Sequence, residues 1–229
     1  MRNNESGNVL FLILIAVALF AALSYAVTQT TRPNSLRTDK TSTINAAQLI
    51  QYPTGLRTAI LRMVIDGISA DELEFNIPAD FTSLSNNTIG VFHPDGGGAV
   101  YNPATTGIMA SGLQGDWYFN MNFEIEHIGL SVVNNLSGND LIAFLPGIRR
   151  SVCENINETI GINSSIPNST ADLSAPYTSY MDNTYTLPAN EVILGTSGSN
   201  GTDALTGQPY GCFQNNGGEY VYYQVLIER

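Results

Sequence analysis

The chain has 229 residues, a net charge of −11 and only two cysteines. Beyond its apolar first thirty residues, about 200 residues remain, which is enough for one well-packed domain. The acidic balance makes nucleic-acid phosphates and anionic lipid surfaces unfavourable partners, so nucleic-acid binding is not expected.

An uncharged apolar run from Val9 to Val27 follows the short polar segment Met1–Gly7. It contains no Gly or Pro, and as a helix its nineteen residues would be about 28 Å long, close to the hydrocarbon thickness of a bilayer. The sequence therefore predicts a long apolar N-terminal helix that spans a membrane or packs against like helices.

Three interpretations of this run differ in whether the chain is cleaved there, and at which residue. A secretory signal peptide would be cleaved after the small-x-small site Ser24-Tyr25-Ala26, although the apolar core is long for that class. An uncleaved signal anchor fits the length. Arg32, Arg37 and Lys40 follow the run while one arginine precedes it, so the positive-inside rule would place the soluble part in the cytoplasm.

The third interpretation rests on the residues around Gly7. Glu5-Ser6-Gly7, followed by Asn8 and an unbroken apolar run, resembles the N-terminus of type IV pilins and pseudopilins. The resemblance implies cleavage between Gly7 and Asn8, a β-rich globular head, and assembly through the N-terminal helix. The chain departs from the family at Asn8, where pilins usually have Phe or Met, and at Leu12, where they have Glu. A minor or tip subunit fits these departures better than a major pilin.

The predicted organisation is a leader (1–7), a transmembrane or filament-core helix (8–31), a linker (32–40) and one soluble α+β domain (41–229). Pro33 marks the break after the apolar run.

The soluble domain is expected to begin with an amphipathic helix. Apolar residues recur at three- and four-residue steps from Thr41 to a stop near Gly67. Pro53 and Gly55 interrupt the pattern, so a kink or two shorter helices are expected there.

Strand patterns follow this helix. Leu73–Asn76 is a short candidate, and Ile89–His93 with Ala99–Tyr101 is predicted to form a hairpin around a glycine-rich turn. In Asp116–Glu126, apolar and polar residues alternate, so one face is expected in the core and the other in water. The expected core face is Trp117, Phe119, Met121, Phe123 and Ile125, and the expected water face is Tyr118, Asn120, Asn122, Glu124 and Glu126.

The rest of the chain is predicted as a helix over Asp140–Ile160, a long functional or mobile loop over Asn163–Gly211, and a central strand at Tyr220–Ile227. The expected fold is α+β and pilin-like. It combines the long N-terminal apolar helix with an amphipathic helix packed on an antiparallel β-sheet.

Cys153 and Cys212 match no zinc or redox spacing, so a single disulfide is their simplest pairing. It would close a loop of roughly sixty residues and contribute about 4 kcal/mol. Two buried free thiols are the alternative. A disulfide favours an oxidising compartment, which is the opposite orientation to that of the positive-inside rule.

No residue pattern indicates catalysis. His93 and Asp95 flank a proline and are interpreted as a turn rather than as a metal site or a base. Glu124 and Glu126, next to His127, share a strand face and are interpreted as solvated rather than as an acid–base pair.

Two oxygen-rich segments, Gly138–Asp140 and Ser197–Asp203, do not follow the spaced-carboxylate pattern of calcium loops. Calcium binding there stays open, and no cofactor or metal ligand is predicted.

The predicted function is structural: a minor pilin or pseudopilin of a type IV pilus or type II secretion-like filament at the bacterial cell surface. Its expected location is the inner membrane, as a single-pass protein with a periplasmic or extracellular domain. The expected partners are other pilin-like subunits and the lipid bilayer, and neither enzymatic activity nor a small-molecule substrate is expected. The alternative is a membrane-anchored or secreted binding domain that does not polymerise.

Overall fold

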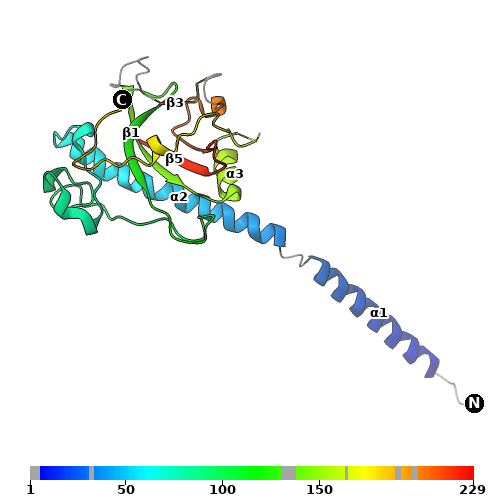
Figure 1. The fold of residues 1–229 in the computed structure, drawn as a ribbon. Coiled ribbons are helices and arrows are strands. Elements are labelled where there is room, and N and C mark those ends of the chain that lie inside the picture. The colour runs from blue at the N-terminus through cyan, green and yellow to red at the C-terminus, as the bar shows by residue number, and fades with distance from the viewer. Residues whose placement is uncertain (1–5, 31–33, 130–137, 163–164, 189–191, 197–200) are drawn as a thin grey trace, which may run out of the picture. The chain divides into compact units, whose positions relative to one another are not determined.

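The computed structural model describes residues 6–30, 34–129, 138–162, 165–188, 192–196 and 201–229 (Figure 1). Contacts between residues gather within two units, Met1–Thr41 and Ser42–Arg229.

The first unit contains helix α1, Ser6–Thr30. Among the described residues, no helix has both the length and the apolar character that crossing a membrane requires. The fold predicted around a long, membrane-spanning N-terminal helix is therefore wrong, whereas the α+β class is confirmed.

Helix α2, Asn34–Ile65, begins inside the segment predicted as the linker and runs without interruption through Pro53. Burial of an apolar stripe in the core outweighs the cost of proline in a helix, about 3 kcal/mol. The helix stops where predicted, because Gly67 takes a φ of 99° and Ile68 donates to the Met63 carbonyl at 3.1 Å. The buried stripe consists of Ala46, Leu49, Pro53, Leu56, Ile60 and Met63.

A five-stranded sheet with the order β3-β1-β2-β5-β4 forms the centre of the second unit. Neighbouring strands are antiparallel except β1 and β3, which are parallel, so the prediction of a purely antiparallel sheet is wrong at this edge. The long connection between β2 and β3 allows that parallel placement. The strands are β1 (Tyr118–Ile125), β2 (Asp140–Pro146), β3 (Val192–Leu194), β4 (Tyr210–Gln214) and β5 (Tyr220–Ile227).

Two apolar clusters cover the two faces of the sheet. Helix α2 and helix α3, Arg150–Thr159, pack in the first cluster, as Figure 1 allows the reader to follow. Helix α4, Ser174–Tyr177, and the segments around it pack in the second. Short 3-10 helices complete the described structure at η1 (Ala70–Glu72), η2 (Pro78–Ser83), η3 (Asn87–Ile89) and η5 (Asp203–Leu205).

Strand β1 confirms the predicted strand but not its faces. The register shifts between Asn120 and Phe123, as at a β-bulge, and an extra residue exchanges the two faces. Met121 therefore packs in the first cluster, whereas Phe123 packs in the second.

The predicted water face of β1 is also wrong in part. Asn120, Asn122 and Glu124 are all buried. The Asn122 amide donates to the Pro176 carbonyl at 2.8 Å, so the α4 segment covers this face.

The helix predicted over Asp140–Ile160 is wrong in its first part, which forms the middle strand, β2. An unbroken apolar run fits a buried strand as well as a buried helix, and β2 is buried along almost its whole length. The predicted loop over Asn163–Gly211 contains α4 and β3 and packs on the sheet.

The predicted hairpin near residues 89–101 is also wrong. Instead, Gly97 donates to the Gly90 carbonyl at 3.0 Å and Ala99 to the Val91 carbonyl at 3.1 Å, so the chain forms a tight wrapped loop. Glu74, inside the predicted short strand, makes only an isolated bridge to Gly90.

Candidate functional site

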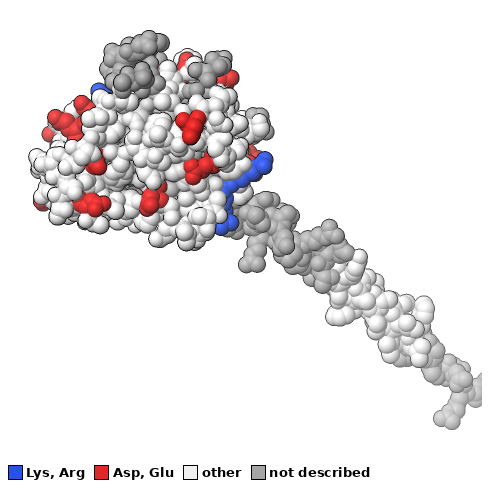
Figure 2. All heavy atoms as spheres, viewed as in Figure 1, with Lys and Arg blue, Asp and Glu red and all other residues white. Residues whose placement is uncertain are grey.

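The surface of α1 is the largest apolar feature among the described residues. Every described large apolar side chain of this helix is exposed in the single chain, from 41% at Ile15 to 72% at Phe20. Figure 2 shows this stretch free of charged side chains. Helical periodicity gives it no polar side, so it can pack against apolar partners all round. Gly7 and Asn8, the predicted processing site, lie at the start of α1, and their side chains are outside the described part.

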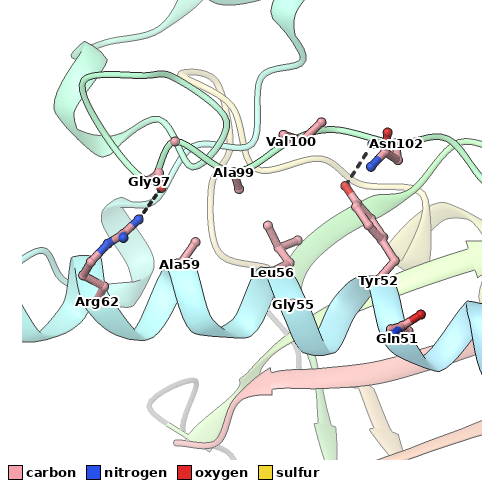
Figure 3. Close-up of a pocket in the computed structure, with 11 residues that line it drawn as sticks. Gln51, Tyr52, Gly55, Leu56, Ala59, Arg62, Gly97, Ala99, Val100 and Asn102 are labelled. Carbon is pink, nitrogen blue, oxygen red and sulfur yellow. Dashed lines mark hydrogen bonds between the residues drawn. The ribbon is translucent and has the colours of Figure 1, made fainter.

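A groove of about 340 Å³ lies beside α2 in the second unit. Residues 97–102 run along the helix and are tied to it twice (Figure 3). The Arg62 guanidinium donates to the Gly97 carbonyl at 2.7 Å, and the Asn102 amide N–H donates to the Tyr52 hydroxyl at 3.3 Å. Between these two contacts, Leu56 and Ala59 point from the helix towards Ala99.

Small residues create the groove. A Cβ on Gly55 would meet no atom within 4 Å, so the space over this residue is open. Gly97 has the opposite role, because a Cβ there would overlap the Val91 carbonyl oxygen and lie 2.8 Å from the Met63 sulfur. Glycine at position 97 therefore lets the loop come close enough for Arg62 to bond its carbonyl.

A second groove, of about 230 Å³, adjoins the first at Tyr52 and Asn102. The ring of Tyr52 lies 5.3 Å from the ring of Trp117, which also lines this groove. The indole N–H of Trp117 is buried and has no hydrogen-bond partner among the described residues. The two grooves extend along one side of α2.

No sequence pattern predicts a site at these groove residues. Gly55 by itself indicates only an interruption of the helix. Its position one turn from both Gln51 and Ala59, on the side away from the apolar stripe, is the signal that a gap in the helix surface leaves in the sequence.

The predicted disulfide between Cys153 and Cys212 is confirmed. It joins α3 to β4 with their Cα atoms 5.4 Å apart. Asn157 reinforces the same contact, since its side chain donates to the Cys212 carbonyl at 2.8 Å and accepts from the Cys212 amide at 2.9 Å.

The polar residues that the sequence singled out do not gather into one site. The imidazole of His93 accepts from the Asp95 amide at 3.2 Å, which confirms a turn. Glu124 is buried rather than solvated, whereas Glu126 accepts from the Thr196 hydroxyl at 2.5 Å. His127 has a φ of 65° in the turn after β1.

Asp140 is a buried carboxyl group of the second unit whose pKa is shifted upward. It is fully buried at the start of β2, where it accepts from the amides of Ile125 at 3.0 Å and Arg229 at 3.1 Å. Burial is the main cause that raises its pKa to about 7; the two hydrogen bonds oppose this shift, and the nearby carboxylates Glu124 and Glu228 add to it. Asp140 therefore has a structural role, because its side chain joins the ends of two strands.

The calcium question stays open for the two oxygen-rich segments. Ser197–Asn200 lies outside the described residues, and Asn139 donates to the Met121 carbonyl at 2.7 Å. In the described ranges, no three His, Cys, Asp or Glu side chains come together as metal ligands.

No family model matches the chain, and no characterised protein or solved structure is significantly similar to it. Arguments about function therefore rest on the chain's own chemistry.

Proposed function

We propose that the protein is a structural subunit of a cell-envelope filament, a minor pilin or pseudopilin, whose copies or partner subunits associate through the apolar surface of α1. The observation that carries the proposal is the exposure of this surface from Leu10 to Tyr25. The second unit has its own two-sided apolar core.

The free energy available from burying the apolar side chains of α1 favours association between helices. Complete burial of a large apolar side chain is worth about 1.5–3 kcal/mol, and these side chains are roughly two-thirds exposed. Burial of the whole surface would therefore yield on the order of 10 kcal/mol, comparable to the estimated 4–15 kcal/mol cost of association. Several partner helices packed together, as in a filament, would exceed that cost more safely than a single pair.

The disulfide supports an oxidising location for the second unit, which agrees with a periplasmic or extracellular subunit. Figure 2 shows acidic side chains spread over the second unit. Because like charges repel, such a surface limits unspecific association between the second units of different copies.

The test compares two substitutions at similarly exposed leucines. Leu14→Asp changes α1, where the side chain is 62% exposed, and Leu113→Asp changes the second unit, where it is 70% exposed. We expect Leu14→Asp to abolish recovery of the protein in sheared filaments while Leu113→Asp leaves it unchanged, with equal thermal unfolding of the second unit. If the Leu14→Asp protein still assembles, or if the wild-type protein is never found in filaments, the proposal is wrong and a non-polymerising binding domain takes its place.

Processing is tested separately. Cleavage between Gly7 and Asn8 predicts a mature protein that begins at Asn8, which N-terminal mass spectrometry of the native protein measures directly. An intact Met1 would contradict this cleavage, and a start at Val27 would instead indicate secretion without the helix.

A further inference from the structure

We propose that the groove between α2 and residues 97–102 binds an unbranched aliphatic monocarboxylate, with its carboxylate at Arg62 and its hydrocarbon chain over Gly55 towards Tyr52. This inference concerns the second unit alone and does not depend on assembly through α1.

Arg62 supplies the charge at one end of the groove. Its guanidinium has five N–H donors in total, and among the described residues it makes one hydrogen bond, to the Gly97 carbonyl. Across the described ranges, no carboxylate forms an ion pair with Arg62, although Asp66 is one helical turn away, whereas Arg57 pairs with Glu228 at 3.4 Å. A carboxylate offers the planar, two-oxygen acceptor that matches the free edge of a guanidinium.

The body of the groove suits a hydrocarbon chain. No acidic residue lines it, and its middle is formed by Gly55, Leu56, Ala59 and Ala99. Tyr52 and Arg62 are ten residues apart on the same side of the helix, which corresponds to about 15 Å along its axis. Figure 3 shows this open length between the two hydrogen-bonded ends. The groove is thus long, apolar in the middle and cationic at one end.

The chain carries its own reporter for binding. Trp117 is the only tryptophan, and its ring contacts Tyr52 at the far end of the groove. The experiment titrates decanoate into the full-length protein, held in solution by an amphipathic polymer, and follows tryptophan fluorescence. We expect a saturable change, and at least tenfold weaker binding of methyl decanoate, which has the same chain without the charge.

Three variants locate the ligand. Arg62→Gln removes the charge and is expected to weaken decanoate binding about tenfold or more. Gly55→Leu fills the open space and is expected to abolish binding. Arg57→Gln, the matched control on the same helix, is expected to leave the affinity within twofold. Thermal unfolding of each variant shows that the fold is retained, and all three are expected to assemble like the wild type because α1 is unchanged.

The outcomes separate the explanations. No saturable change with wild-type protein, equal binding of decanoate and its methyl ester, or wild-type affinity in both Arg62→Gln and Gly55→Leu would each overturn the proposal, the last because decanoate would then be adsorbed on α1. A short peptide that ends in a leucine carboxylate, compared with its C-terminal amide, distinguishes a polypeptide end from a free fatty acid as the source of the same chemistry. A preference for the peptide acid over decanoate would overturn the proposal, because the ligand would then be a polypeptide end rather than an aliphatic monocarboxylate.

Discussion

Asp140 allows a sharp test of how the second unit is held together. Its carboxylate accepts from the backbone amides of Ile125 and Arg229 and thereby joins the ends of β1 and β5 to β2. Because burial raises its pKa to about 7, the folded chain binds this proton more tightly than the unfolded chain, in which the pKa is close to 3.8.

Proton linkage gives the sign and magnitude of the effect of Asp140 on stability. The stabilisation that comes from tighter proton binding by folded Asp140 is fully present below about pH 3.8. It is lost as the pH rises through about 7, so the free energy of unfolding falls over this range. One pKa unit corresponds to about 1.36 kcal/mol, so this group should lower the stability by roughly 2.5 kcal/mol between about pH 5 and about pH 8.

The assay is urea unfolding at these two pH values, followed through the buried Trp117, for the wild type and Asp140→Asn. Asparagine has one oxygen for two amide donors, so the variant should be about 1–3 kcal/mol less stable at pH 5. That deficit should shrink by about 2.5 kcal/mol at pH 8, because only the wild type must ionise a buried group. Glu158→Gln, at an exposed carboxylate, serves as the control. A wild-type-to-variant difference that is equal at both pH values would refute the argument.

Other predictions concern the same unit. Replacing Cys153 and Cys212 together by alanine removes a crosslink between residues 59 positions apart and should lower the free energy of unfolding by about 4 kcal/mol in urea; no change after reduction of the wild type would contradict this. Asn157→Ala leaves buried backbone groups of β4 without partners and should cost about 2–3 kcal/mol by the same measurement. Gly96→Ala would place a Cβ against backbone carbonyl oxygens of its own loop and should lower the melting temperature, whereas Gly217→Ala, with open space around it, should change stability by less than about 0.5 kcal/mol. Equal melting temperatures for the two glycine variants would count against the wrapped loop.

Local sequence patterns predicted the elements in which tertiary packing favours the same structure as the local preference does. The core side of α2 follows from its three- and four-residue apolar spacing, and Gly67 ends the helix because only a left-handed residue can cap it there. Strand β5 follows from its β-branched and aromatic residues. In both cases, local preference and tertiary packing favour the same structure.

Two failures have a tertiary origin. Periodicity cannot distinguish a strand buried on both faces from a buried helix, and β2, the middle strand, is that case. In β1, a strict alternation of residue types hid the bulge near Met121, which exchanges the faces partway along the strand. The groove beside α2 was missed for a related reason, since an open space over Gly55 depends on a loop more than forty residues later in the chain.

The segment predicted as a long loop shows how this chain uses amide side chains. Segments rich in Asn, Ser and Thr are typical of solvated loops, yet residues 173–185 lie against β1, where Asn120 donates to the Tyr177 and Ser179 carbonyls at 3.2 and 3.0 Å. The Tyr185 hydroxyl accepts from the Met121 amide at 2.9 Å and donates to the side-chain oxygen of Asn122 at 2.8 Å. These bonds satisfy backbone groups that a regular strand ladder would otherwise pair, without placing charges in the interior. In a chain with so few lysines and arginines, buried amides hold an irregular segment on the sheet where ion pairs have few cations to use. The asparagines of β1, which the alternation predicted to face water, are therefore part of what fixes this segment in place.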